Sequence, residues 1–194
     1  LGHFFGAITE FLGFRAHNGE GKVMGLAPYG SENEAIERQL RNVIETGADY
    51  DVTELTAHGR SIRDSVEVLE TTLGRRSKSS PVAFTEWEKD LAFTAQKLLE
   101  ETVVNVVESY CRRFSMEKVA LAGGVALNCK MNKRIMESDA VEELFVQPVA
   151  HDGGLALGAG MLTQRPQDVE EMTDVYLGSS YDTDEITSLL ETNK

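Results

Sequence analysis

The sequence predicts an α/β domain, and the order of short apolar runs, glycine turns and helical patterns in its second half leads to that prediction. Two short apolar runs are each followed by a helical pattern: 118–122 with 125–137, and 144–146 with 155–162. Short apolar strands that alternate with helices are typical of parallel sheets whose strands are buried on both faces. We therefore expect an α/β domain with two neighbouring βα units whose strands are parallel.

Apolar residues at helical spacing predict further helices before this region. The expected helices cover 2–14, a segment opened by a Ser31/Glu34 capping box, 61–73, and a long segment from a Thr85/Glu88 capping box to about Arg113. Residues 75–81 are rich in serine and basic residues, which is typical of a mobile surface loop. Short strands are expected at 49–52 and 175–177, and a last helix is expected around Ile186–Leu190.

Composition excludes several classes of protein. The chain has 194 residues with 41% hydrophobic content, which is typical of one compact globular domain. It contains no apolar run of about 18 residues that could span a membrane. A net charge of −13, from 19 basic and 32 acidic residues, repels nucleic-acid phosphates, so no nucleic-acid partner is expected. Cys111 and Cys129 lack a metal-site spacing and are expected to be buried free thiols in a cytoplasmic protein.

Two loops follow the predicted strands at the edge where open α/β sheets bind their ligands. Gly123-Gly124 follows the first strand and lets the backbone approach a ligand closely, and the helix start after it suits phosphate. His151 and Asp152 follow the second strand. Each feature also has a purely structural explanation: a tight turn for the glycines, a helix cap for Asp152 and a surface position for His151. Together they point to a nucleotide and metal site.

Three segments carry a resemblance to a known family: 18–30 (NGEGKVMGLAPYG), 121–128 (LAGGVALN) and 145–159 (FVQPVAHDGGLALGA). In this order and with helices between them, they resemble the carbamoyltransferases of nodulation and antibiotic tailoring. The resemblance implies an α/β lobe of the actin/Hsp70-like ATPase fold, which is ribonuclease H-like and has a mixed sheet with flanking helices. It also implies that residues 1–175 form the second lobe of the carbamoyl-transfer module, and that 176–194 begin the connection to an adenylating module outside this chain. The apolar start at Leu1 is likewise typical of a segment cut from a longer protein.

The family resemblance also implies a reaction. The adenylating module makes carbamoyl adenylate from carbamoyl phosphate and ATP. The actin-like module then passes the carbamoyl group to the hydroxyl of a small molecule at a divalent metal, which is iron in this family. The isolated chain is expected to be inactive and to bind adenine nucleotide weakly, because actin-like folds hold the nucleotide between two lobes.

Site residues follow from the matched positions. The positions that the resemblance assigns to nucleotide binding are Gly123, Gly124, Asn128, Gly30, Glu20 and Lys22. For Lys22, a solvent-exposed helix lysine is an equal alternative. Asp152 matches the carboxylate ligand of the metal. The family's pair of metal-binding histidines, spaced i and i+4, has no counterpart among the four histidines, so the remaining ligands are expected outside this chain.

Two other functions remain alternatives at this point. A relative of the tRNA threonylcarbamoyl-transfer protein would share the module, although the charge of −13 opposes a tRNA substrate. A nucleotide-binding lobe of an actin-like kinase or chaperone would share the fold without transfer chemistry. An uncovered apolar face of such a lobe could also pair two copies into a homodimer.

Overall fold

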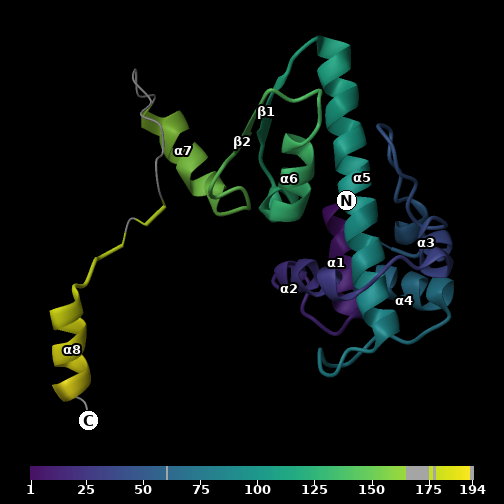
Figure 1. Ribbon diagram of the computed structural model, residues 1–194, viewed down its shortest axis with the longest axis horizontal. Coiled ribbons are helices and arrows are strands. Elements are labelled where there is room, and N and C mark those ends of the chain that lie inside the picture. Colours follow the sequence, from purple (N-terminus) through teal and green to yellow (C-terminus); the bar gives the residue numbers. More distant parts are fainter. Residues whose placement is uncertain (60, 165–174, 177, 193–194) are drawn as a thin grey trace. The chain divides into compact units, whose positions relative to one another are not determined.

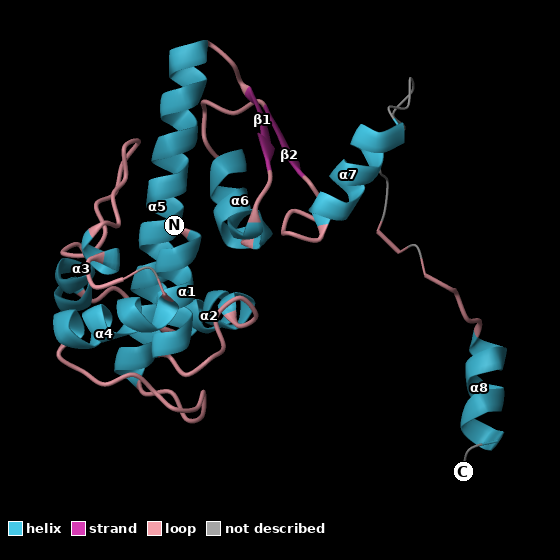
Figure 2. Ribbon diagram, turned by 180° about the vertical axis from the view of Figure 1, so that it is seen from behind, coloured by secondary structure: helices cyan, strands magenta, loops and turns pink. Residues whose placement is uncertain are grey.

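The computed structural model describes residues 1–59, 61–164, 175–176 and 178–192 (Figure 1). The chain divides into two compact units, Leu1–Gly153 and Gly154–Lys194, and each is described by itself. The first unit combines helices with a small parallel sheet, so the predicted α/β class is confirmed at that level. Figure 2 shows the same helical and sheet parts from behind.

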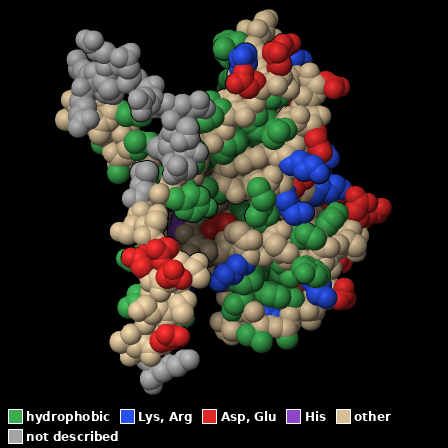
Figure 3. Space-filling view, turned by 60° about the vertical axis from the view of Figure 1, so that its left-hand side comes forward, with side chains coloured by type: hydrophobic (Ala, Val, Ile, Leu, Met, Phe, Trp, Pro, Cys, Tyr) green, Lys and Arg blue, Asp and Glu red, His purple; other side chains and the backbone are tan. Residues whose placement is uncertain are grey.

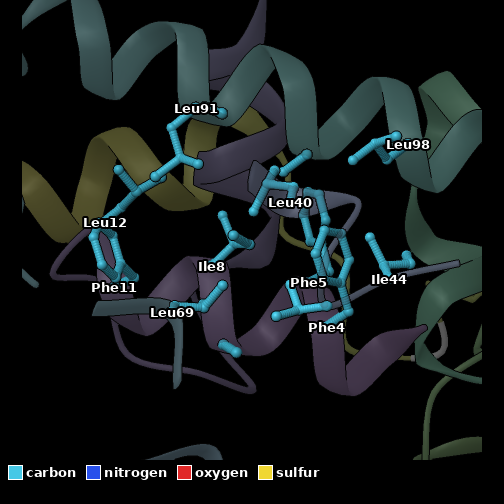
Figure 4. Close-up of a cluster of buried hydrophobic side chains, with 14 of the residues drawn as sticks. Phe4, Phe5, Ile8, Phe11, Leu12, Leu40, Ile44, Leu69, Leu91 and Leu98 are labelled. Atoms are coloured by element: carbon cyan, nitrogen blue, oxygen red, sulfur yellow. The ribbon is translucent and has the colours of Figure 1, made fainter. Parts of the chain in front are cut away.

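A helical core forms the larger part of the first unit (Figure 4). Helix α1 (Gly2–Phe11) packs against α4 (Ile62–Leu73) and against the long α5 (Glu86–Phe114). Burying one such leucine or phenylalanine side chain contributes about 1.5–3 kcal/mol, so this cluster is the main source of stability. Its largest fully buried side chains include Phe4, Ile8, Phe11, Leu12, Leu40, Leu69, Leu91 and Leu98.

Capping boxes begin two of these helices. Thr85 and Glu88 cap α5 as the sequence predicts, with each side chain accepting a hydrogen bond from the other residue's backbone N–H. Ser61 and Asp64 cap α4 in the same way. Each cap satisfies two backbone donors that the first helical turn leaves without a partner. The helices predicted over 61–73 and from Thr85 onwards are therefore confirmed.

The predicted Ser31/Glu34 capping box is wrong. Helix α3 (Glu34–Leu40) is capped by Asn33, whose side chain accepts a hydrogen bond from the Ile36 N–H. Ser31 instead donates its N–H and its hydroxyl to Asp90 Oδ1, at 2.9 and 3.2 Å, and the Asn33 amide donates to Asp90 Oδ2 at 3.2 Å. A carboxylate on α5 thus holds the start of α3, which the local pattern could not reveal.

Acid should weaken this clamp. Burial raises the pKa of the Asp90 carboxyl, but the hydrogen bonds from Ser31 and Asn33 outweigh it and leave the pKa below its usual value. A lowered folded-state pKa stabilises the fold above the unfolded pKa of about 3.9, and this contribution is lost as the pH falls through the folded pKa. The urea midpoint of Asp90→Asn should therefore depend less on pH between about pH 6 and pH 3 than that of the wild type. Parallel curves would contradict this role for Asp90.

The sheet consists of β1 (Lys118–Leu121) and β2 (Glu143–Val146), which run parallel with Lys118 opposite Glu143. Helix α6 (Cys129–Met136) connects them and packs with α5 against one face of the sheet, where Val119, Leu121 and Leu144 join the second apolar cluster. The expectation of strands buried on both faces is wrong for the described chain. Every second strand residue, such as Ala120 and Phe145, is exposed.

The remaining segments of the first unit are short. They are helix α2 (Glu20–Leu26) and the 3₁₀ turns η1 (Ala27–Tyr29), η2 (Glu54–Thr56) and η3 (Gly124–Leu127). The strand expected at 49–52 is reduced to one antiparallel bridge between Glu45 and Asp51. Acidic and basic side chains are interspersed on the face shown in Figure 3, as expected for a solvated surface.

The basic segment 75–81 is a loop at the surface, as the sequence predicts, but contacts with the helical core hold it in place. The Lys78 N–H donates to the Phe11 carbonyl at 2.8 Å, and the Arg75 guanidinium lies 4.3 Å from the centre of the Trp87 ring. Gly13, at φ +84°, lets the loop approach so closely that a Cβ there would lie 2.7 Å from the Ser80 carbonyl carbon. The loop is therefore packed on the end of α1.

The second unit contains α7 (Gly154–Gln164) and α8 (Thr183–Thr192), which match the two helices expected there. The strand expected at 175–177 is not found: Val175 and Tyr176 are not in a strand, and residue 177 lies outside the described residues. None of the helices in the described ranges is long and apolar enough to cross a membrane.

Candidate nucleotide-binding site

The two loops that follow the strands lie side by side. The Gly123 N–H donates to the Ala150 carbonyl at 2.7 Å, and the Gln147 N–H donates to the Leu121 carbonyl at 3.3 Å. Parallel strands end at the same edge of a sheet, so this contact follows from the topology. The Gly123-Gly124 loop and the 150–152 loop thus share one edge of the first unit.

The glycine loop is open. Gly123 has a φ of +100°, a conformation that favours glycine over residues with a side chain. A Cβ added at Gly123 or Gly124 would have no heavy atom within 4 Å. The backbone here is accessible to a ligand. Close packing within the described chain therefore does not account for the glycine at position 124.

Asp152 lies in an exposed turn beside this loop. Its neighbour His151 accepts a hydrogen bond from the Gly153 N–H through Nδ1 at 3.0 Å, so that nitrogen shapes the turn. Across the described residues, no group of three or more His, Cys, Asp or Glu side chains could hold a metal ion. One carboxylate does not hold iron, which requires several imidazole or carboxylate ligands acting together. The residues described here therefore do not fit a metal site by themselves.

Asn128 lies behind the glycine loop, with its side chain buried rather than exposed to a ligand. It caps α6, because its Oδ1 accepts the Met131 N–H at 3.0 Å. The same oxygen accepts from Gln96 Nε2 at 3.0 Å, and Asn128 Nδ2 donates to Gln96 Oε1 at 2.9 Å. This reciprocal amide pair joins α6 to α5. A nucleotide contact through Asn128 Oδ1 would compete with the bonds from Gln96 and Met131.

Helix α2 brings the first of the three motif segments to the same region. Met24 Sδ lies 3.8 Å from Cys129 Sγ, at the start of α6. In α2, Glu20 accepts the His17 N–H at 2.7 Å. The Lys22 side chain is exposed, with its Nζ 5.8 Å from the centre of the Phe14 ring. The structure therefore ties Glu20 to its own turn and leaves Lys22 at the surface.

Gly30 is a packing residue in this structure. A Cβ at this position would lie 2.2 Å from the Lys89 carbonyl oxygen and 2.4 Å from its carbon. Both are backbone atoms of α5, so they cannot move aside as a flexible side chain could. The close approach of η1 to α5 explains the glycine without any ligand.

Residues 1–161 match the family model described as the carbamoyltransferase N-terminus. This chain belongs to the carbamoyltransferase family. The match covers all three segments that carry the resemblance, and so it includes the glycine loop, Asp152 and α2.

Three curated proteins from different organisms are similar to this chain over nearly its whole length. Nodulation protein NolO of Bradyrhizobium diazoefficiens is 33% identical over 97% of the chain, which covers 33% of NolO. Nodulation protein NolNO of Sinorhizobium fredii is 33% identical over 95% of the chain, which covers 26% of that protein. The uncharacterized protein sll1178 of Synechocystis is 31% identical over 98% of the chain and 33% of its own length. The chain thus spans between about a quarter and a third of the length of these relatives.

Near the site of this carbamoyltransferase chain, sequence reasoning missed Gln96 and Asn132 and was wrong about the burial of Cys129. Gln96 is buried on α5, and a polar residue within an apolar helix stripe was the available signal. Cys129 is exposed beside Met24, which corrects the expectation that both thiols are buried; Cys111 is buried. Asn132 donates to the Ala126 carbonyl in η3 at 2.8 Å, while its buried Oδ1 has no hydrogen-bond partner among the described residues.

Proposed function

We propose that this chain is part of an O-carbamoyltransferase and forms the second lobe of its actin-like carbamoyl-transfer module. In the proposed reaction, carbamoyl adenylate made from carbamoyl phosphate and ATP donates its carbamoyl group to the hydroxyl of a small molecule. Membership of the carbamoyltransferase family and the similarity to two nodulation proteins support this class of reaction. A cytoplasmic location and a homodimer belong to the same proposal.

The observation that carries the proposal is the contact between the two loops. The Gly123 N–H donates to the Ala150 carbonyl, which holds the accessible glycine loop beside Asp152. In α/β sheets this edge is where nucleotides bind, and the first N–H groups of the following turn have no partner within the turn. The loop therefore offers backbone donors at a place that a phosphate can reach.

In the transfer step, the hydroxyl oxygen of the acceptor forms a bond to the carbamoyl carbon, and the bond from that carbon to the phosphate oxygen breaks. AMP leaves with the bonding electron pair, and the hydroxyl proton is lost to a base. Backbone N–H groups near Gly124 would stabilise the negative charge that develops on the leaving phosphate. Asp152 would supply one ligand of a divalent metal, iron in this proposal, and the other ligands would come from outside the residues described here.

Asn128 has a supporting role in this proposal. Its side chain is occupied by the Met131 N–H and by Gln96, so it fixes the start of α6 directly after the glycine loop. Glu20 and Lys22 on α2 are the proposed outer contacts of the nucleotide. Of these two, Lys22 has the exposed side chain and can approach a phosphate without breaking a hydrogen bond seen in the structure.

A side chain added to the glycine loop should weaken nucleotide binding without unfolding the protein. Gly124→Val places a side chain where no heavy atom lies within 4 Å, so the fold should tolerate it. We expect at least tenfold weaker binding of ATP to the intact protein in a calorimetric titration, since a loss of about 1.4 kcal/mol corresponds to tenfold. Gly178→Val, also at an open position, is the matched control. Equal affinities for both variants would contradict the proposed nucleotide loop.

The 194-residue chain alone should bind ATP weakly. One loop at one sheet edge contacts one side of a nucleotide, and the proposed fold holds the nucleotide between two lobes. Calorimetry on the chain alone is expected to show no binding at micromolar ATP. Micromolar affinity would argue against a site shared between two lobes.

A further inference from the structure

A polar cavity of about 970 Å³ lies beside the basic loop 75–81, between the end of α1 and one side of α4. In both ribbon views, α4 lies beside the lower half of α5, whereas β1, which the glycine loop follows, lies beside the upper half (Figures 1 and 2). Neither the glycine loop, nor α2, nor the 150–152 loop contributes a residue to the lining. The cavity is therefore separate from the candidate nucleotide site.

The lining of this cavity has an excess of positive charge, although the whole chain carries a net charge of −13. Residues 71–85, which include the basic loop, contain no Asp or Glu. A local excess of cations in an acidic protein favours an anionic ligand. The ionisable side chains of the lining are four cations and three carboxylates: Arg63, Arg75, Arg76, Lys78, Glu10, Glu67 and Glu70.

Two arginines of the lining keep most of their hydrogen-bond donors unused. The side chains of Arg76 and Arg63 are 91% and 89% exposed. Arg76 donates to Glu70 through Nη1 at 2.8 Å, and Arg63 Nε lies 4.0 Å from Glu67; within the described ranges neither arginine has another such partner. A guanidinium group carries five N–H donors in a planar fork that matches two oxygens of a phosphate. Two such forks therefore line one cavity.

The loop that carries Arg76 is ordered by contacts within the chain. Glu70 Oε1 accepts the Ser77 N–H at 2.8 Å and the Ser77 hydroxyl at 2.7 Å, while Glu70 Oε2 accepts from Arg76. Contacts with the Phe11 carbonyl and the Trp87 ring hold the same loop. Both oxygens of Glu70 are thus occupied, and this carboxylate orients Arg76. A loop that is already ordered loses less conformational entropy when a ligand binds.

We infer that this cavity binds a phosphate group, either as free phosphate or as part of a phosphorylated small molecule. Arg63 and Arg76 would donate to the phosphate oxygens, and the exposed Ser79 hydroxyl, which also lines the cavity, would add a donor. Pockets for small organic ligands have volumes of about 300–1,000 Å³, so a phosphorylated small molecule suits the size better than phosphate alone. The inference goes beyond the proposed function and does not depend on it.

Calorimetric titration of the intact protein with inorganic phosphate and with a sugar phosphate tests the inference. The titrations use the Gly124→Val variant, so that binding at the glycine loop does not contribute. Both ligands should bind, and Arg63→Gln/Arg76→Gln should weaken binding at least about tenfold, because charge-assisted hydrogen bonds are lost. Tighter binding of the sugar phosphate supports a phosphorylated small molecule, and equal binding supports free phosphate. No binding, or binding that both arginine substitutions leave unchanged, would overturn the inference.

Two further variants separate recognition of phosphate from effects of charge or folding. Arg63→Lys/Arg76→Lys keeps both charges and removes both forks, so its affinity for phosphate should be about three- to tenfold lower than with both arginines. Arg38→Gln/Arg134→Gln makes the same change in net charge at two exposed arginines outside the cavity, and should keep the affinity within about twofold. An equal loss of affinity in this control would show that overall charge attracts the phosphate, and would overturn the site.

Discussion

Replacing Gly30 by alanine should lower the free energy of unfolding of the first unit by about 3 kcal/mol or more, at the upper end of the range for overpacking. The added Cβ would lie 2.2 Å from the Lys89 carbonyl oxygen of α5, so either η1 must move away or the helix must distort. Moving η1 would also disturb the hydrogen bonds from Ser31 to Asp90 next to it. Urea unfolding followed by circular dichroism measures the loss.

Gly21→Ala is the control for this prediction. Gly21 lies in α2, and a Cβ there would have no heavy atom within 4 Å. Alanine is favoured over glycine within a helix by about 0.5–1 kcal/mol, so this variant should be slightly more stable than the wild type. If Gly30→Ala kept its stability and lost only nucleotide binding, Gly30 would be a ligand contact and the packing explanation would be wrong.

Local sequence patterns predicted several helices of the helical core in the first unit. The Thr85/Glu88 box and the apolar stripe after it set the start and length of α5, because both signals lie within a few residues in the chain. The Ser31/Glu34 box failed because Asp90, 59 residues away, binds Ser31. The loop 75–81 has a surface composition, but α1 and Trp87 hold it through contacts that depend on the tertiary fold.

The part of the candidate site that could be predicted is the one that depends only on the order of strands and helices. Two neighbouring βα units imply adjacent strand ends, and the structure places the Gly123-Gly124 loop beside Ala150. The sequence cannot distinguish an open glycine from a packed one: Gly124 has no heavy atom near its Cβ position, while Gly30 meets the backbone of α5. The buried partner of Asn128 was also unpredictable, because it depends on how α6 packs against α5.

Gln96→Leu should destabilise the first unit by about 2 kcal/mol, since a buried polar group that loses its partner costs about 1–3 kcal/mol. The substitution leaves Asn128 Nδ2 without its acceptor in a buried position. Asn128→Ala should cost a similar amount because it removes both the cap of α6 and the partner of Gln96. The double variant should lose less than the sum of the two, with a coupling of about 1 kcal/mol. Gln39→Leu is the control for replacing a glutamine by leucine, because Gln39 is half-buried on α3.

The same variant decides what Asn128 does in the intact protein. If Asn128 turned outward to contact a nucleotide, binding would have to break the pair with Gln96, and its loss in Gln96→Leu would make binding tighter. If Asn128 stays buried as the cap of α6, removing Gln96 changes the free energies of the nucleotide-free and the nucleotide-bound protein equally. The affinity for ATP then stays the same, because it depends only on the difference between these two states. We expect the ATP dissociation constant of Gln96→Leu to stay within about threefold of the wild-type value, a difference below about 0.7 kcal/mol. A clearly tighter constant would show that Asn128 leaves its buried position and touches the nucleotide directly.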